Sequence, residues 1–219
     1  MINLIDYIKK SNRFQTIEID DSLAVKYECF IEEDRSEIWS HTNYFSFVVN
    51  GKKKWKTINN SILVNSGDIL FVKKGTHTVY QYFDEPFYVL FIFVDDRFIK
   101  QVVLECQKEG MLHISSNNVH DNLIIIDKNE LLKSYQSSFN LLFAQNVKTS
   151  KSLLKLKIKE LLLNLLTQPG NDRLKSFFIS LNMDKNSLLE QTMQSNFHQP
   201  LSLTEFARLT ARSLSSFRR

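Results

Sequence analysis

The sequence predicts an α+β protein in which a β-rich half is followed by helices. Up to about residue 94, short runs rich in Phe, Tyr, Val and Ile are separated by Asn, Gly or Pro, a pattern typical of an all-β sandwich or barrel. Beyond Asp95 the apolar residues recur about every 3.6 positions, as in amphipathic helices. The 219 residues suit one large or two small domains, and a hydrophobic content of 43% with 5 Gly and 3 Pro excludes disordered and collagen-like chains.

The first half contains the strands, and two glycine-containing turns within it are informative. We expect strands over residues 16–19, 23–31, 44–50, 54–58, 61–64, 68–72, 76–83 and 87–94. Asn50-Gly51 predicts a tight hairpin to the strand that contains Trp55, because both residues tolerate the positive φ that a primed turn requires. The apolar segment 69–72 lies between Gly67 and Gly75, which predicts a buried strand between two turns.

A basic run with one tryptophan, residues 52–56, follows the Asn-Gly turn. Lysines next to an aromatic residue suggest nucleic-acid contact, but the position favours an exposed strand whose charges prevent pairing with other chains. Alternation along a strand also allows Trp55 to point inward. We therefore interpret the run as structural.

Two long helices are expected after the strands, over residues 129–145 and 150–166, and they form a helical hairpin. Leu132, Tyr135 and Phe139 share one face of the first. Four residues share one face of the second, namely Leu154, Ile158, Leu161 and Leu165. Because the second helix is apolar over more than half its circumference, this stripe is either core alone or the seam of a homodimer, and we assign these four residues to dimerisation. Gln168-Pro169-Gly170 ends the helix, and shorter helices are expected over 172–181, 186–197 and 202–210.

Several function classes are excluded by what the sequence lacks. It contains no nucleophile elbow, P-loop or dinucleotide fingerprint, so we expect no enzyme. Cys29 and Cys106 are too few for a disulfide framework and are expected to be buried or half-buried thiols. No apolar run approaches the roughly 20 residues that cross a bilayer, and the N-terminus lacks a signal-peptide stretch. We expect a soluble, cytoplasmic protein with no membrane partner.

The last 21 residues carry a motif with specific spacing. Ser202 or Thr204 can cap one short helix, Ala207 is a small residue at its centre, and Ser213 can cap a second helix that contains Phe217 and Arg219. This segment resembles the opening of the first helix-turn-helix of AraC/XylS-type transcription regulators.

The rest of the chain is consistent with this resemblance. The β-rich half is similar to the cupin-like regulatory domain of these bacterial regulators, and residues 67–75 match its glycine-bounded strand; residues 70–75 are most similar to the subgroup that activates type III secretion genes. The resemblance implies a cupin-like β-barrel or sandwich over residues 1–128, a helical dimerisation and linker region over 129–182, and a partial DNA-binding domain over 183–219.

The resemblance also implies functional residues. Ser215, Arg218 and Arg219 correspond to positions that face the major groove, where Arg can donate two hydrogen bonds to guanine, and Arg212 adds a phosphate contact. The second helix-turn-helix of the family is absent, because the sequence stops at Arg219. We therefore expect a shortened gene product or a piece of a longer protein, with DNA as a partner of the full-length form.

A metal site and an effector site remain to be considered. Cupin enzymes bind metal through two closely spaced histidines, a carboxylate and a third histidine, whereas His41 has no histidine two positions later and His77 is alone on its strand. We expect no metal or other cofactor. His77 either faces solvent or the barrel mouth, or forms a hydrogen-bonding wall of a ligand cavity. The function expected is an AraC-type regulator that senses a small molecule or a regulatory protein and dimerises; the alternative is a stand-alone cupin-like binding module.

Overall fold

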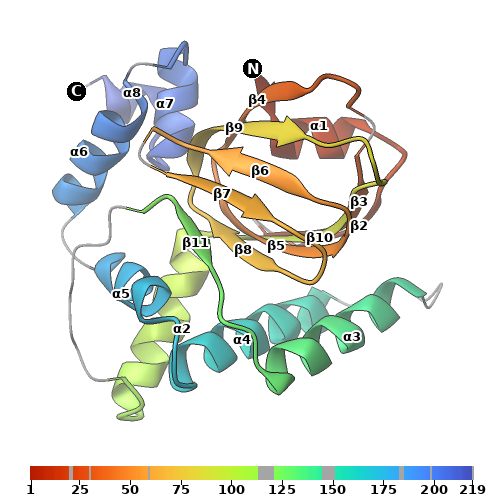
Figure 1. The fold of residues 1–219 in the computed structure, drawn as a ribbon. Helices are drawn as coiled ribbons and strands as arrows, with labels where there is room; N and C mark the ends of the chain where they lie inside the picture. Colours follow the sequence, from red (N-terminus) through yellow and green to blue (C-terminus); the bar gives the residue numbers. More distant parts are fainter. Residues whose placement is uncertain are drawn as a thin grey trace.

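The computed structural model describes residues 1–19, 22–29, 31–58, 60–112, 121–144, 151–182, 185–197 and 199–218. Two β-sheets face each other as an open sandwich, and helices lie beneath and beside it (Figure 1), which confirms the α+β class. In the described part of the chain, the five-stranded front sheet has the order β1 (Ile2–Asn3), β4 (Arg35–Ser40), β9 (Gly75–Gln81), β6 (Lys53–Lys56), β7 (Ser61–Val64). The six-stranded central sheet has the order β11 (Leu123–Ile125), β8 (Ile69–Val72), β5 (Asn43–Asn50), β10 (Tyr88–Val94), β3 (Ser22–Glu28), β2 (Gln15–Ile19). Neighbouring strands are antiparallel, apart from the parallel pair β1 and β4.

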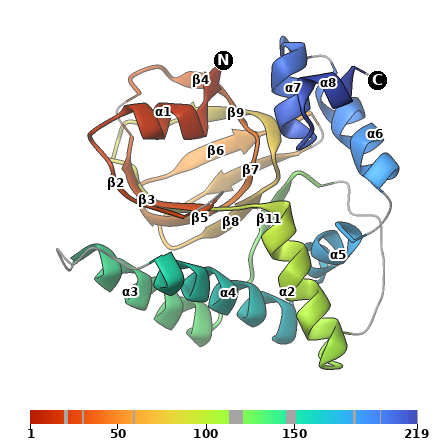
Figure 2. The ribbon, with the colours of Figure 1, turned by 180° about the vertical axis from the view of Figure 1, so that it is seen from behind.

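The helices fall into three groups. Helix α1 (Leu4–Lys10) packs its apolar residues into the core between the sheets. The second group lies against the central sheet and comprises α2 (Asp96–Lys108), α3 (Glu130–Ala144), α4 (Lys151–Thr167) and α5 (Asp172–Ser180) (Figure 2). The third group, α6 (Lys185–Asn196), α7 (Leu203–Leu209) and α8 (Leu214–Phe217), lies beside the front sheet. No helix among the described residues is long and apolar enough to cross a membrane.

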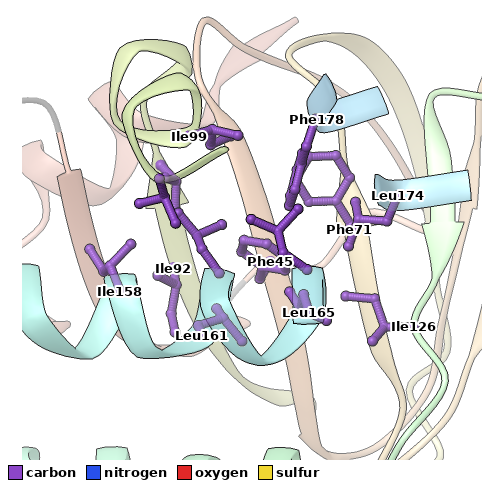
Figure 3. Close-up of a cluster of buried hydrophobic side chains, with 14 of the residues drawn as sticks. Phe45, Phe71, Ile92, Ile99, Ile126, Ile158, Leu161, Leu165, Leu174 and Phe178 are labelled. Atoms are coloured by element: carbon purple, nitrogen blue, oxygen red, sulfur yellow. The ribbon is translucent and has the colours of Figure 1, made fainter. Parts of the chain in front are cut away.

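The central sheet is buried on both faces. Alternate residues of its strands point in opposite directions. Tyr44 and Phe93 therefore enter the core between the two sheets, while Phe45 and Phe71 enter the core between the central sheet and the helices. Figure 3 shows this second core, where the rings of Phe45 and Phe71 lie 5.0 Å apart and Phe178 from α5 meets the Phe71 ring edge-on at 5.4 Å. Double burial explains why these strands are nearly continuous apolar runs.

Helix α4 faces inward with the residues that we assigned to dimerisation. Leu154, Ile158, Leu161 and Leu165 are at most 1% exposed and pack against the central sheet and its neighbouring helices. They cannot line a seam between two subunits without opening the core of the chain, so that assignment needs correction. On the same helix Leu156 is 63% exposed.

Asn50-Gly51 does not form the expected hairpin. β5 belongs to the central sheet and β6 to the front sheet, so the two residues connect the sheets. Gly51 does have a positive φ, of 77°, but its decisive property is space, because a Cβ there would lie 2.8 Å from the carbonyl oxygen of Pro86. The Asn50 side chain donates to the same oxygen at 2.8 Å.

The lysine run is not an exposed edge either. β6 lies between β9 and β7, and both Lys53 and Trp55 point into the sandwich, where they are 5% and 2% exposed. Lys54 and Lys56 point to the outer face. The structure therefore confirms that Trp55 points inward, and it shows that Lys53 is buried beside it.

Phe71 tests the double burial of the central sheet. We expect Phe71→Ala to lower the free energy of unfolding by about 3–5 kcal/mol, because it leaves a cavity between Phe45 and Phe178. Urea unfolding followed by circular dichroism measures the change. The exposed control Leu156→Ala should stay within about 0.5 kcal/mol, and an equally small loss for Phe71→Ala would contradict the packing.

Candidate functional site: the α7–α8 unit and the cleft beside it

Residues 202–218 form a compact pair of helices, which we call the α7–α8 unit. Ser202 caps α7 through a capping box: its Oγ accepts from Glu205 N at 3.3 Å, and the Glu205 carboxylate accepts from Ser202 N at 2.7 Å. Ser213 caps α8 by accepting from Ser216 N at 3.2 Å. Both caps were expected from the sequence, and they set where each helix begins.

A tight turn brings the two helices into contact. Ala211 in the turn has a φ of 52°, and Arg212 N donates to Ala207 O at 2.9 Å. The rings of Phe206 and Phe217 are parallel to within 3°, with centroids 6.4 Å apart. The apolar residues of the motif therefore pack against each other, as the resemblance implies.

The α7–α8 unit is docked on the front sheet through Trp39 of β4. Trp39 is 3% exposed and forms a cluster with Phe206 and Leu209 of α7, with Phe217 packed at its margin. Arg208 lies 5.9 Å from the Trp39 ring, and its Nη1 is 3.4 Å from Asp6 Oδ2. Because this ion pair is solvent-exposed it contributes about 0–1 kcal/mol, so the apolar cluster provides most of the docking energy.

Asn196, the last residue of α6, makes the polar contact of the same interface. Its side chain is buried, and Oδ1 accepts from both the backbone N and Oγ1 of Thr76, each at 3.1 Å. Its Nδ2 donates to Thr192 O at 2.8 Å, which fixes the orientation of the amide. Gly75 makes room, since a Cβ there would lie 3.1 Å from Asn196 Oδ1.

The β8–β9 turn, just before Thr76, is itself held by a charged cluster. Asp96, at the start of α2, accepts from Asn43 Nδ2 at 2.6 Å and from Lys74 Nζ at 2.7 Å. The backbone N of Lys74 donates to Asn43 Oδ1 at 2.9 Å. These contacts connect α6, through the β8–β9 turn, to the central sheet and α2.

A cleft of about 660 Å³ lies over the outer face of the front sheet, beside the end of α6. Thr76, Thr78 and Tyr80 of β9 form its floor, and Gln194 and Phe197 form the wall on the C-terminal side. Arg35 and Glu37 of β4, which pair at 2.9 Å, also line it. The volume is in the range of small-molecule sites, and the lining offers hydroxyl, amide and guanidinium groups.

His77 is among the residues that line this cleft, and its ring is directed between the sheets toward Tyr44. It is 5% exposed, and its Nε2 is 2.8 Å from the Tyr44 hydroxyl, to which Trp55 Nε1 donates at 3.4 Å. The expectation that His77 faces solvent is therefore wrong. Burial lowers the pKa of His77 to about 3, so the ring is neutral at physiological pH.

The residues that we expect to contact DNA gather at the end of the described chain. Ser215 and Arg218 are exposed, Arg212 is half-buried in the turn, and Arg219 lies outside the described residues. We did not predict that Trp39, Asp6 and Asn196 hold the C-terminal helices, because no local pattern in the sequence indicates contacts between positions so far apart. In the described ranges, no three His, Cys, Asp or Glu side chains form a metal-binding group.

Comparison with known proteins identifies the class. Residues 43–177 match the model of a family described as the ExsA N-terminal regulatory domain, and no curated protein matches significantly in sequence. ToxT from Vibrio cholerae has a similar structure, with a TM-score of 0.52 and 13% identity over 90% of this chain and 75% of ToxT. ToxT from Vibrio cholerae O395 bound to (E)-4-(8-methylnaphthalen-1-yl)but-3-enoic acid gives a TM-score of 0.51 and 14% identity, covering 91% of this chain and 76% of that one. The AraC-like transcriptional activator CuxR gives 0.48 and 10% identity over 92% and 70%.

The fold and the match together define the N-terminal regulatory domain of an AraC-type regulator, built as a cupin-like sandwich. Because the family model covers more than half of the residues, the chain belongs to the ExsA N-terminal regulatory domain family. The resemblance found in the sequence is thereby confirmed.

The role of Asn196 in docking can be tested by limited proteolysis. We expect Asn196→Ala to release the C-terminal helices, because Thr76 loses both hydrogen bonds to the amide. Cleavage between α5 and α7 should become faster, while the sandwich fragment stays resistant. Gln194→Ala, on the exposed side of α6, is the matched control, and equal cleavage rates in all three proteins would contradict the docking.

The buried His77 should make stability depend on pH. The folded pKa is about 3 and the unfolded value is near 6.5, so the unfolded state takes up the proton first. The stability contributed by the neutral ring is therefore complete above about pH 6.5 and is lost as the pH falls toward 3. In urea titrations at about pH 7 and about pH 5, His77→Gln should lose less stability on acidification than the unmodified protein. Parallel losses would contradict the burial.

Proposed function

We propose that this protein is a transcription regulator whose sandwich senses an effector and whose α7–α8 unit contacts DNA. The observation that carries the proposal is the α7–α8 unit itself, two capped helices that keep Ser215 and Arg218 exposed while α7 is docked on the front sheet. The proposed effector site and the proposed DNA contact would thus lie on two parts of the chain, the front sheet and the α7–α8 unit, that pack against each other.

The DNA contact follows from the chemistry of the exposed side chains. An arginine on a helix in the major groove can donate two hydrogen bonds to guanine O6 and N7, and a serine hydroxyl can bond to a base edge or a phosphate. Arg212, in the turn before α8, and Arg219 add positive charge beside Arg218. Arg208 is occupied by Asp6 and Trp39 and is left out of the DNA surface.

The effector site that we propose is the cleft between β9 and the end of α6. A molecule bound there would touch both Thr78 of the front sheet and Gln194 of α6, so it would change how the C-terminal helices are held. Hydroxyl and amide groups suit a polar head, while Phe197 and Ile58 are exposed apolar side chains at its margin. The naphthyl-substituted butenoic acid bound to ToxT supports the proposal that the effector is a small amphipathic molecule. His77, which also lines the cleft, would contribute to the effector site through its hydrogen bond with Tyr44.

The division of the chain follows the same order. Residues 1–128 would form the effector-sensing part, 129–182 the helical part that carries a dimer contact, and 183–219 the part that contacts DNA. Since the inward face of α4 is filled by the core, we propose that a homodimer uses the outward face, with Leu156 of α4 and Leu141 of α3. Activation of type III secretion genes stays a prediction from the sequence.

Chromatin immunoprecipitation of the protein, expressed from its own chromosomal gene, tests DNA binding. We expect discrete promoter sites whose occupancy falls at least about fivefold in Arg218→Ala, because one bidentate base contact is worth about 1–3 kcal/mol. Arg173→Ala, another exposed arginine, is the matched control. Absence of discrete sites, or occupancy unchanged by Arg218→Ala, would favour a stand-alone binding module.

Light scattering tests the dimer. We expect about twice the chain mass of 25.7 kDa at micromolar concentration, and a monomer for Leu156→Glu, because a carboxylate would be buried at the contact. Leu104→Glu on α2, where the side chain is 47% exposed, is the control. A monomeric unmodified protein would disprove the dimer.

A further inference from the structure

A lysine and a cysteine meet at one end of the sandwich interior. Cys29 follows β3 of the central sheet, and Lys53 begins β6 of the front sheet, yet Lys53 Nζ lies 2.8 Å from Cys29 Sγ. Lys53 is 5% exposed, and no described carboxylate lies within ion-pair distance of it. The partner of this buried amine is therefore a thiol, an uncommon choice for a lysine in a protein core.

The surroundings keep the pair in position. Cys29 donates to Gln81 Oε1 at 2.9 Å and accepts from the Tyr27 hydroxyl at 3.8 Å. The Lys53 ammonium lies 4.5 Å from the centre of the Phe87 ring. Both sheets and the β9–β10 connection thus converge on the two side chains.

A small cavity beside Lys53 contains polar groups with unused hydrogen-bonding capacity, although Cys29 is not among its lining residues. Its volume is about 20 Å³, enough for a molecule the size of water, and Lys53, Gln81 and Ser36 line it. Gln81 Nε2 and Ser36 Oγ have no hydrogen-bond partner among the described residues, although their side chains are 9% and 4% exposed. Buried polar groups are normally satisfied, so these two indicate a small hydrogen-bonding guest.

We propose that Cys29 and Lys53 form a modification site, at which a hydroperoxide oxidises the thiol and the two side chains then join through a sulfur–nitrogen bond. Hydrogen peroxide is the smallest oxidant of this class. Cys29 is half-buried, so a small oxidant can reach it.

The two steps balance as follows. The Cys29 sulfur attacks one peroxide oxygen; the O–O bond breaks, and the second oxygen leaves as water after taking up the thiol proton, which Lys53 Nζ relays. The products are a neutral sulfenic acid and a neutral amine. The amine then attacks the sulfur, the S–O bond breaks, and a second water leaves. One peroxide is reduced to two waters, and the side chains lose two hydrogen atoms in total.

Burial supports the second step. An amine needs a free electron pair to attack, and desolvation lowers the pKa of Lys53 from its usual value. Sulfenic acids are known to condense with nitrogen in this manner and to return to the thiol under reduction.

The bond would connect the two sheets of the sandwich. β3 and β6 belong to different sheets, so the crosslink would hold the interior closed at the end where Phe87 lies. Cys106 offers no equivalent site, because it is fully buried in the helical core, where burial raises the pKa of its thiol. The chemistry is independent of the proposed DNA contact.

Mass spectrometry of the purified chain tests the proposal. After treatment with equimolar hydrogen peroxide and digestion, we expect the peptides containing Cys29 and Lys53 to be joined, with a mass two hydrogens below their sum. Dithiothreitol should separate them, and the oxidised chain should melt at a higher temperature than the reduced one.

Three variants complete the test. Lys53→Arg keeps the positive charge but lacks a nucleophilic amine, so its Cys29 should instead react with the sulfenic-acid reagent dimedone. Lys54→Arg, one position along the strand, and Cys106→Ser should both retain the crosslink. The proposal is overturned if the unmodified chain forms no crosslinked peptide and its Cys29 reacts with dimedone as strongly as in Lys53→Arg.

Discussion

The structure depends on burying both faces of one six-stranded sheet. Its strands expose a layer of aromatic and branched side chains on either side, and neither layer is stable in water. The front sheet and α1 cover one face, and α2 to α5 cover the other. This requirement explains the wide apolar surface of α4, most of which is used within the chain.

The front sheet has a different role, because its outer face is only partly covered. Trp39 and Thr76 lie beneath the C-terminal helices, whereas Thr78 and Tyr80, further along β9, line the open cleft. The same strand thus holds α6 at one end and offers a binding surface at the other. Through Lys74 and Asp96 it is also connected to the central sheet, so a change in the cleft reaches rigid parts of the sandwich.

Local patterns in the sequence predicted much of the fold. The helices over 129–145 and 150–166 were found within a residue of their ends, because amphipathic period and the Pro169-Gly170 stop are local signals. The capping serines of α7 and α8 were found for the same reason. β4 was missed because the sequence Arg35–Ser40 is mainly polar and its tryptophan faces outward, beneath α7. α1 was missed because it is short, and α2 because its stripe of Ile99, Val102, Val103 and Cys106 was not singled out.

The candidate sites were less predictable, because they depend on contacts between distant positions. Asn50-Gly51 has the local chemistry of a hairpin turn, and only the pairing of β5 with β10 shows that it crosses between sheets. The sequence indicated a solvent-exposed Lys53, because it does not show that β6 lies between β9 and β7. Likewise, no pattern near residue 39 or near residue 209 indicates that Trp39 and Leu209 share one cluster.

The sandwich holds the C-terminal helices through Trp39. Hydrogen exchange measured by mass spectrometry on the unmodified protein and on Trp39→Ala tests it most directly, since amide protection reports local opening. We expect α6 and α7 to lose protection in Trp39→Ala, while β5 and β10 keep theirs. Unchanged protection of α6 and α7 would contradict it.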